Sequence, residues 1–517
     1  MAYYLGIDLG TQSMKALLID PESNSVSDPL SVHYGRELPR YRSLEGFLPD
    51  DDPTVRRADP RMWLDALDLL MGKMRDAKWE LSRVEGISGS GQQHGTVYLN
   101  GSFPAIMDRI DAGQTLSAQL APAFSRPLAP IWMDASTGKE CAMLRKRFGK
   151  ALREITGSDA AERFSAAQIM KFAREDADGY RRTASIHLIS SFFASVLAGK
   201  IMPADHGDGA GMNLADLRNW VWDREIADFA APGMTDKLPP LVPSDTAAGK
   251  LSAYFAKYGL RPGIPVTVWS GDNPNSLIGC GGYAPGTAVV SLGTSDTFFG
   301  SIRDLREAPT RFGHVFGNPA GGFMFLLCFA NGSLTREAVR RRFGFDRKEF
   351  ENAALAAAPG RYRLLPFLYP ESTPSVTVPG MFYDFDPEKV SAGELIRALL
   401  ESQILTMKFH AGPTVRPQRI RLTGGASASP LLRRIVADVF QAPVAVGESA
   451  EAAALGAAMR AANSAGGYSF AELTEKFCAA GETVAPDRTK AGCYDAAFEA
   501  FGRLYDEKVP GKEKSEK

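Results

Sequence analysis

The sequence reads LGIDLGTQS at residues 5–13 and VVSLGTS at residues 289–295, so the tripeptide Leu-Gly-Thr follows an apolar run twice. A second strand-like run comes after each copy, at residues 14–19 and 297–300. Gly and Thr in a tight hairpin turn can direct backbone N–H groups and a hydroxyl toward phosphate oxygens. Two unrelated hairpins could share a tripeptide, but the matching context favours two similar domains that face one nucleotide.

A third stretch, SGDNP at residues 270–274, places an acid where α/β proteins bind ligands. Residues 264–269 before it are apolar and β-branched, which predicts a buried strand. Asp272 follows the end of that strand, at the edge of the sheet where ligands bind. A carboxylate there can accept the proton of a substrate hydroxyl. The alternative is an Asx-turn, which Asp-Asn-Pro sequences commonly form.

Composition limits the class of protein. The chain has 517 residues, of which 44% are hydrophobic and 23% charged, as in soluble globular proteins of one to three domains. Its net charge of −1 predicts no binding to nucleic acid or to a membrane. The five cysteines are widely spaced and form no Cys-x-x-Cys pair, which argues against disulfides and structural zinc. Together with the lack of a signal peptide, this predicts a cytoplasmic protein.

Strand-like runs alternate with helical patterns along the chain, which predicts an α/β fold. Strands are expected at 84–88, 96–99, 419–422 and 444–446, and helices at 60–74, 165–173, 185–197, 333–341, 395–410, 430–440 and 451–462, while residues 323–329 are apolar. Residues 205–213 are rich in Gly and Asp and predict turns. We expect an N-terminal domain over 1–284, a C-terminal domain over 285–507 and a charged tail over 508–517.

Common nucleotide and metal motifs are missing. No Gly-x-x-x-x-Gly-Lys-[Ser/Thr] loop, dinucleotide-binding Gly-x-Gly-x-x-Gly, protein-kinase signature or His-Glu-x-x-His pattern occurs. What remains is the two hairpins, scattered carboxylates, and Gly424-Gly425 between a strand and a helix. A Gly-Gly turn lets a base or a phosphate lie against the backbone, although ordinary βα turns share this feature. This set fits phosphoryl transfer, which depends on positioning and charge stabilisation.

The motifs resemble those of the FGGY family of carbohydrate kinases, most closely its xylulose kinases of the eukaryotic type. The resemblance rests on GIDLGTQS at 6–13, GQQHG at 91–95, WMDAST at 132–137, ERF at 162–164, DGAGMNL at 208–214, GDNP at 271–274, SLGTSDT at 291–297, LCF at 327–329, NGS at 331–333 and TGGAS at 423–427. They run in family order over nearly the whole chain. The resemblance implies two actin-like (ribonuclease H-like) domains with a central cleft that holds ATP and a sugar.

The resemblance also implies roles for single residues. Asp272 matches the general base, and an Asp with an ordinary pKa of about 3.9 is ionised at neutral pH. Sugar contacts match His94, Gln93, Arg163 and Asn273. The match for the metal is Asp8, acting on Mg²⁺ through water. The residues matching the ATP site are Thr11, Gln12, Thr294, Gly424, Gly425 and Ala426.

The expected reaction is ATP-dependent conversion of D-xylulose to D-xylulose 5-phosphate. Two alternatives stay open. The first is a kinase of the same family that acts on another sugar or polyol, such as ribulose or glycerol. The second is an actin-like nucleotide-binding protein that phosphorylates no sugar. The expected ligands are a small sugar, ATP and Mg²⁺, and the expected state is a monomer or a homodimer.

Overall fold

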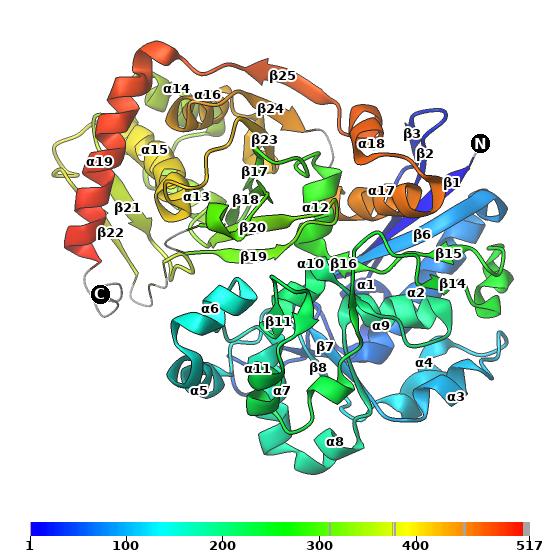
Figure 1. Ribbon diagram of the computed structural model, residues 1–517. Coiled ribbons are helices and arrows are strands. Elements are labelled where there is room, and N and C mark those ends of the chain that lie inside the picture. The colour runs from blue at the N-terminus through cyan, green and yellow to red at the C-terminus, as the bar shows by residue number, and fades with distance from the viewer. Residues whose placement is uncertain (1, 310–311, 375, 377–378, 448–450, 510–517) are drawn as a thin grey trace. The chain divides into compact units, whose positions relative to one another are not determined.

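The computed structural model describes residues 2–309, 312–374, 376, 379–447 and 451–509, which form two compact units (Figure 1). The first unit is built from the described residues of Met1–Tyr283, Val315–Met324 and Glu451–Cys478. The second is built from those of Ala284–His314, Phe325–Ala450 and Ala479–Lys517. Each unit therefore gathers segments that are distant in the sequence.

The sheet of the first unit begins with the first Leu-Gly-Thr hairpin. Strand β1 (Tyr3–Leu9) pairs antiparallel with β2 (Ser13–Asp20), and Leu9 lies opposite Met14. Strand β6 (Val84–Gly91) pairs parallel with β1, so that Leu9 lies opposite Gly91. The strands run in the order β14 (Gly249–Lys250), β15 (Pro265–Val266), β6, β1, β2 and β3 (Ser25–Val26). Strand β16 (Ser270–Gly271) pairs with β6, and β4 (Leu30–His33) pairs with β2. The hairpin and the end of β6 thus lie at one edge of the sheet.

Both faces of this sheet are covered by helices. Because side chains alternate along a strand, Leu5, Ile7 and Leu9 share one core with α2 (Pro60–Asp76) and α9 (Ile189–Ala198). The other face carries Tyr4, Leu17 and Ile19, which share a core with α17 (Ala452–Gly466) (Figure 1). Helix α17 comes unusually near, since a Cβ on Gly6 would lie 2.1 Å from the Ala454 carbonyl oxygen.

The second unit repeats this arrangement with the second hairpin. Strands β17 (Thr287–Leu292) and β18 (Asp296–Ile302) are antiparallel, and Leu292 lies opposite Asp296. Strand β23 (Arg419–Thr423) runs parallel to β17, as β6 does to β1. Helices α15 (Ala392–Ala411), α16 (Pro430–Phe440) and α19 (Ala491–Lys508) pack against one another in this unit (Figure 1). The prediction of two similar hairpins in matching context is confirmed.

Three sequence expectations differ from the structure. Residues 264–269 do not form one strand; two short strands, β15 (Pro265–Val266) and β16 (Ser270–Gly271), pair with β6 instead. The expected helix 185–197 begins only at Ile189, because β9 (Ser185–Leu188) pairs with β7 (Thr96–Leu99). Residues 205–213 contain a short helix, α10 (His206–Gly209), and a 3₁₀ turn, Ala210–Met212. Most of the expected tail, residues 510–517, lies outside the described residues.

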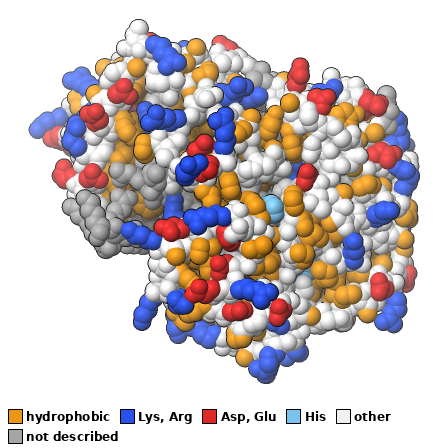
Figure 2. All heavy atoms as spheres, viewed as in Figure 1, with side chains coloured by type: hydrophobic (Ala, Val, Ile, Leu, Met, Phe, Trp, Pro, Cys, Tyr) orange, Lys and Arg blue, Asp and Glu red, His pale blue; other side chains and the backbone are white. Residues whose placement is uncertain are grey.

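The surface carries charges of both signs. On the face drawn in Figure 2, Lys and Arg side chains are interspersed with Asp and Glu side chains, with hydrophobic side chains between them. Within the described ranges, no helix combines the length and the apolar composition that are needed to cross a membrane.

Candidate active site

Asp272 lies where a strand passes into a helix. It is the first residue of α12 (Asp272–Gly279) and follows β16, whose Gly271 pairs with Gly91 at the end of β6. Its half-buried carboxylate accepts hydrogen bonds at Oδ1 from Asn273, from the backbone N at 2.9 Å and from Nδ2 at 3.1 Å. The Asx-type contact and a site at the sheet edge therefore occur together at this residue.

The acidity of Asp272 differs from the sequence expectation. Burial raises the pKa of Asp272 to about 7, and the nearby charge of Asp8 adds to the rise. The backbone N–H groups of Gln93, Asp272 and Asn273 oppose this rise in pKa. An ordinary pKa of about 3.9 is therefore wrong for this carboxyl group. A carboxylate with a pKa near the working pH is better matched to accepting a proton from a hydroxyl.

Asp8 supplies a second carboxylate to the same region. Burial raises the pKa of Asp8 to about 6, while the Ser90 hydroxyl and the Lys15 ammonium oppose the rise. Its Oδ1 is buried and has no hydrogen-bond partner among the described residues. Such an oxygen suits a metal-bound water, because it is a hydrogen-bond acceptor that no donor satisfies. The described residues contain no group of three His, Cys, Asp or Glu side chains that could hold a metal alone. A bound ion would thus depend on phosphate oxygens for further ligands.

His94 is held as a neutral ring. It adopts a left-handed backbone with φ of 69°, and its Nδ1 lies 2.8 Å from the carbonyl oxygen of Gly211. Burial and the charge of Arg163 lower the pKa of His94 to about 3. Because a carbonyl only accepts, Nδ1–H is the donor, and Nε2 is left as an acceptor. His94 can therefore accept a hydrogen bond from a hydroxyl group.

Phe164 connects His94 with Arg163. The His94 and Phe164 ring centroids are 4.5 Å apart, and the Arg163 guanidinium carbon lies 5.5 Å from the Phe164 ring centre. The structure thus brings two of the predicted sugar contacts, His94 and Arg163, into one cluster. Asn273 and Gln93 form another pair, because Asn273 Nδ2 donates to Gln93 Oε1 at 2.8 Å.

The first hairpin turn presents Thr11 and Gln12. Gln12 is exposed, and Thr11 Oγ1 accepts a hydrogen bond of 2.8 Å from the Trp132 indole N–H. Trp132 keeps 42% of its surface exposed, which is unusual for so large an aromatic residue. Sequence reasoning quoted Trp132 only as part of a motif and gave it no role. A single exposed Trp carries no local signal, since its contact with Thr11 joins residues far apart in the chain.

The remaining predicted ATP residues lie in the second unit. Thr294 is exposed at the tip of the hairpin between β17 and β18. Gly424 follows β23 with φ of 87°, and a Cβ there would lie 2.5 Å from the Leu292 carbonyl oxygen. Gly425 and Ala426 begin the 3₁₀ turn after it, and Gly425 has open space around it. These residues share one sheet edge, with backbone accessible to a flat or anionic ligand.

Comparisons with known proteins identify the family. The N-terminal domain of the FGGY family of carbohydrate kinases matches residues 114–279, and the C-terminal domain of that family matches residues 288–465. Xylulose kinase 2 of Arabidopsis thaliana is 37% identical over 486 residues, which are 89% of this chain and 87% of that protein. Xylulose kinase of Mus musculus is 36% identical over 518 residues, which are 97% of this chain and 93% of that protein.

Solved structures agree on the fold. The xylulose kinase from Rhodospirillum rubrum superposes with a TM-score of 0.81 at 21% identity, over 98% of this chain and 99% of that chain. The predictions of an actin-like α/β fold with two domains and of a resemblance to xylulose kinases, eukaryotic ones included, are confirmed. The cleft between the domains, the domain limits and the site residues stay predictions. Because the family matches cover much of the chain and the relatives match nearly all of it, the chain belongs to the FGGY family of carbohydrate kinases.

Proposed function

We propose that this protein transfers the γ-phosphoryl group of ATP to a hydroxyl of D-xylulose and so makes D-xylulose 5-phosphate. The observation that carries this proposal is Asp272, a carboxylate with a pKa of about 7 at the ligand-binding edge of the sheet. The relatives named xylulose kinase, at 36% and 37% identity, support the choice of sugar.

Asp272 is the general base in this proposal. Its carboxylate accepts the proton of the sugar hydroxyl while that oxygen bonds to the γ-phosphorus, and the bond to the β-γ bridging oxygen of ATP breaks. His94 Nε2 accepts from a second sugar hydroxyl, and the Arg163 guanidinium donates to another. Asn273 holds both the base and the sugar in register. These contacts act by fixing the angle of attack.

The phosphates of ATP lie against the two hairpin turns in this proposal. Thr11, Gln12 and Thr294 bind phosphate oxygens, while Gly424, Gly425 and Ala426 lie against the adenosine. Asp8 would hold Mg²⁺ through water, and there the ion would supply positive charge against the transferring phosphate. The N-terminal domain (1–284) binds the sugar and the C-terminal domain (285–507) binds ATP. The protein acts on small molecules as a monomer or homodimer in the cytoplasm.

A sugar panel tests the proposal. The purified protein is incubated with ATP, Mg²⁺ and D-xylulose, D-ribulose, L-ribulose, glycerol or D-gluconate, and both ADP and phosphosugar are measured. We expect the highest kcat/KM with D-xylulose. A higher kcat/KM for another acceptor would overturn the choice of sugar. ADP release without any phosphosugar would overturn sugar phosphorylation altogether and leave a nucleotide-binding protein.

A further inference from the structure

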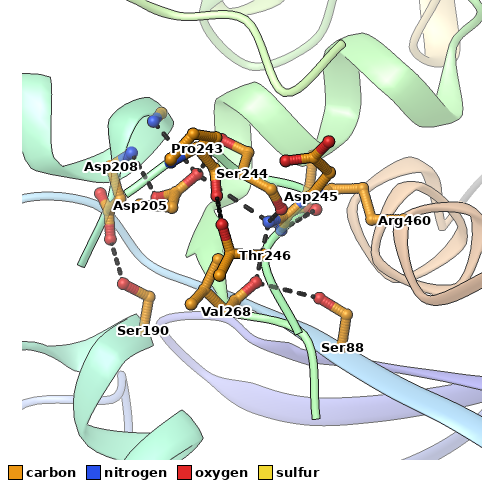
Figure 3. A network of polar contacts seen from close by, with 12 residues as sticks. Ser88, Ser190, Asp205, Asp208, Pro243, Ser244, Asp245, Thr246, Val268 and Arg460 are labelled. Carbon is orange, nitrogen blue, oxygen red and sulfur yellow. Dashed lines mark hydrogen bonds and ion pairs between the residues drawn. The ribbon is translucent and has the colours of Figure 1, made fainter. Parts of the chain in front are cut away.

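Asp208 lies buried behind the predicted sugar contacts. It belongs to α10, and no part of its surface is exposed. Ser190 Oγ donates to its Oδ2 at 2.5 Å, and its own backbone N–H donates to Asp205 Oδ1 at 2.8 Å (Figure 3). Its other oxygen, Oδ1, is buried and meets no hydrogen-bond donor within the described part of the chain. A buried acceptor without a donor is costly, so this oxygen calls for a partner.

The Gln93 side chain supplies the matching donor. Its amide is 2% exposed, and Nε2 is buried without an acceptor among the residues that the structure describes. Both side chains lie beside β16, because α10 packs against β16 and Gln93 Cγ lies next to Gly271. In agreement, Gln93 opposes the rise in the pKa of Asp208 that burial causes. The side chain has little room, because a Cβ on Gly271 would lie 2.4 Å from Gln93 Cγ. Gln93 is therefore confined between Asp208 and Asn273.

This arrangement selects one orientation of the Gln93 amide. Its Oε1 accepts from Asn273 Nδ2, which requires Nε2 to point the other way, toward Asp208. An amide turned by 180° would set its NH₂ group against the NH₂ group of Asn273. Asp208 Oδ1 can accept from Nε2 whether or not the carboxyl group is protonated, since the proton can sit on Oδ2. The selection therefore does not depend on the charge of Asp208.

A buried cation holds the segment around Asp208 in place. Arg460 of α17 lies 3.9 Å from Asp205, and its Nη2 donates to the carbonyl oxygens of Ser244 at 2.6 Å and Val268 at 2.8 Å (Figure 3). Asp205 in turn accepts from Ser244 Oγ at 2.6 Å and from the backbone N of Asp208. This network thus fixes the backbone at Asp208, and Ser190 holds its carboxyl group.

We propose that Asp208 is a positioning residue of the proposed reaction: through the Gln93 amide it fixes Asn273, and through Asn273 it fixes the Asp272 carboxylate. The inference rests on the proposed function of Asp272 as the base. It gives Gln93 a part that the sequence does not indicate, that of a link between a buried acid and the reacting carboxylate. Asp208 itself touches neither sugar nor ATP in this account.

The test is a double-mutant cycle on kcat and on KM for D-xylulose. Asp208→Leu removes the acceptor while keeping the side-chain size, and Gln93→Met removes the link while keeping the side-chain length. We expect each single variant to lower kcat roughly tenfold with KM changed less than threefold, because positioning is lost but binding is kept. We expect the double variant to be no slower than Gln93→Met alone. Multiplying effects, or a change confined to KM, would overturn the inference.

Asp438→Leu is the matched control. Asp438 is also fully buried, has one oxygen without a partner among the described residues, and lies on α16 in the second unit. We expect this variant to change Tm while kcat stays within twofold of the wild type. An equal loss of kcat in Asp438→Leu would mean that any buried Asp has this effect, and would overturn the inference.

A substitute variant and a wild-type measurement separate the possible outcomes. If Asp208→Leu does not fold, Ser190→Ala takes its place in the cycle, because Ser190 is bonded to the other oxygen of the same carboxyl group. Wild-type turnover is measured first and tests the proposed function separately. No phosphosugar from the wild type would overturn the proposed function and this inference with it. Turnover with independent effects in the cycle would overturn the inference alone.

Discussion

The two Leu-Gly-Thr hairpins share a backbone but treat their acids differently. In the second hairpin, Asp296 is 1% exposed, and its two oxygens accept from Arg336 Nη1 at 2.8 Å and Nη2 at 2.9 Å. In the first hairpin, Asp8 precedes Leu9 and keeps a buried oxygen that has no partner among the described residues. One acid is neutralised inside the protein, whereas the other is left for a ligand. The shape of the hairpin turn alone therefore does not determine whether its acid is paired or unsatisfied.

Burial shifts the pKa of the two acids in the same direction, and the neighbouring charges decide how far this shift is opposed. It raises the pKa of both Asp8 and Asp296, but only Asp296 has a guanidinium in contact that opposes the rise. Asp8 has Asp272 as a like-charged neighbour. Two close carboxylates with raised pKa values favour a bound cation or a shared proton. This difference agrees with the proposal that the base and the metal ligand lie in the first unit and that the second unit binds ATP.

The largest effect is expected from Asp272→Asn. This variant removes the proposed base and keeps the shape, so we expect kcat to fall by roughly 10²–10⁴ while the fold is unchanged. Turnover is measured by coupled ADP release and the fold by circular dichroism. Asp178→Asn, an exposed acid on α8 (Ala177–Arg182), serves as control and keeps the wild-type kcat. Normal turnover in Asp272→Asn would remove the difference in chemistry between the two units.

Arg336→Met tests the neutralised acid. It leaves Asp296 buried with an uncompensated charge, so we expect a loss of about 3–5 kcal/mol in the free energy of unfolding of the second unit. Urea titration measures this loss. The comparison variant is Lys15→Met in the first hairpin, where the ammonium is 33% exposed and pairs with Glu451 at 2.7 Å. Its pair is partly solvated, so the expected loss is below about 1 kcal/mol. Equal losses of unfolding free energy in Arg336→Met and Lys15→Met would contradict the difference between the buried and the partly solvated pair.

Asp8→Asn tests the acid that keeps an unsatisfied oxygen. A neutral amide orients metal-bound water less well, so we expect the Mg²⁺ concentration for half-maximal activity to rise roughly 10- to 100-fold. The measurement is a Mg²⁺ titration of turnover at saturating sugar. Asp296→Asn should leave the Mg²⁺ requirement unchanged in whatever fraction stays folded. A Mg²⁺ requirement that does not move in Asp8→Asn would show that this acid does not hold the ion.

The pH dependence of catalysis follows from the raised pKa of Asp272. The base works only when it is ionised, so activity is lost as pH falls through the pKa of about 7. We expect kcat/KM for the sugar to decline roughly tenfold per pH unit below that point, as for one essential base. Initial rates between pH 5 and 9, at fixed Mg²⁺ and ionic strength, give the profile. A profile flat down to pH 5 would disagree with the raised pKa.

The smallest effect is on stability. A carboxyl group whose folded pKa is raised binds protons more tightly when folded, so its stabilising contribution is present at low pH and is lost as pH rises through about 7. Asp272→Asn removes this loss. We therefore expect its Tm to exceed that of the wild type by a few degrees at pH 8 and to match it near pH 4. Differential scanning calorimetry at both pH values checks this, and a lower Tm at pH 8 would contradict it.

The sequence could predict what local pattern determines. The hairpins, β6 and the helix after Ser429-Pro430 follow from apolar periodicity and capping residues, and they form nearly where expected. Pairing between distant segments could not be predicted this way. Strand β9 replaces the start of an expected helix because it has an edge to join in β7. The raised pKa of Asp272 depends first on burial in the folded protein and then on Asp8, which is far away in the chain, so no local pattern carries it.

The late position of helix α17 in the sequence affects how the first unit folds during synthesis. Residues 452–466 pack on β1 and β6 of the first unit, where Gly6 and Gly86 allow close contact. Synthesis begins at the N-terminus, so the first sheet waits with one apolar face bare until most of the chain has left the ribosome. A shortened gene that stops at residue 283 would encode that bare face permanently, and its product would aggregate unless residues 451–478 were supplied as a second chain.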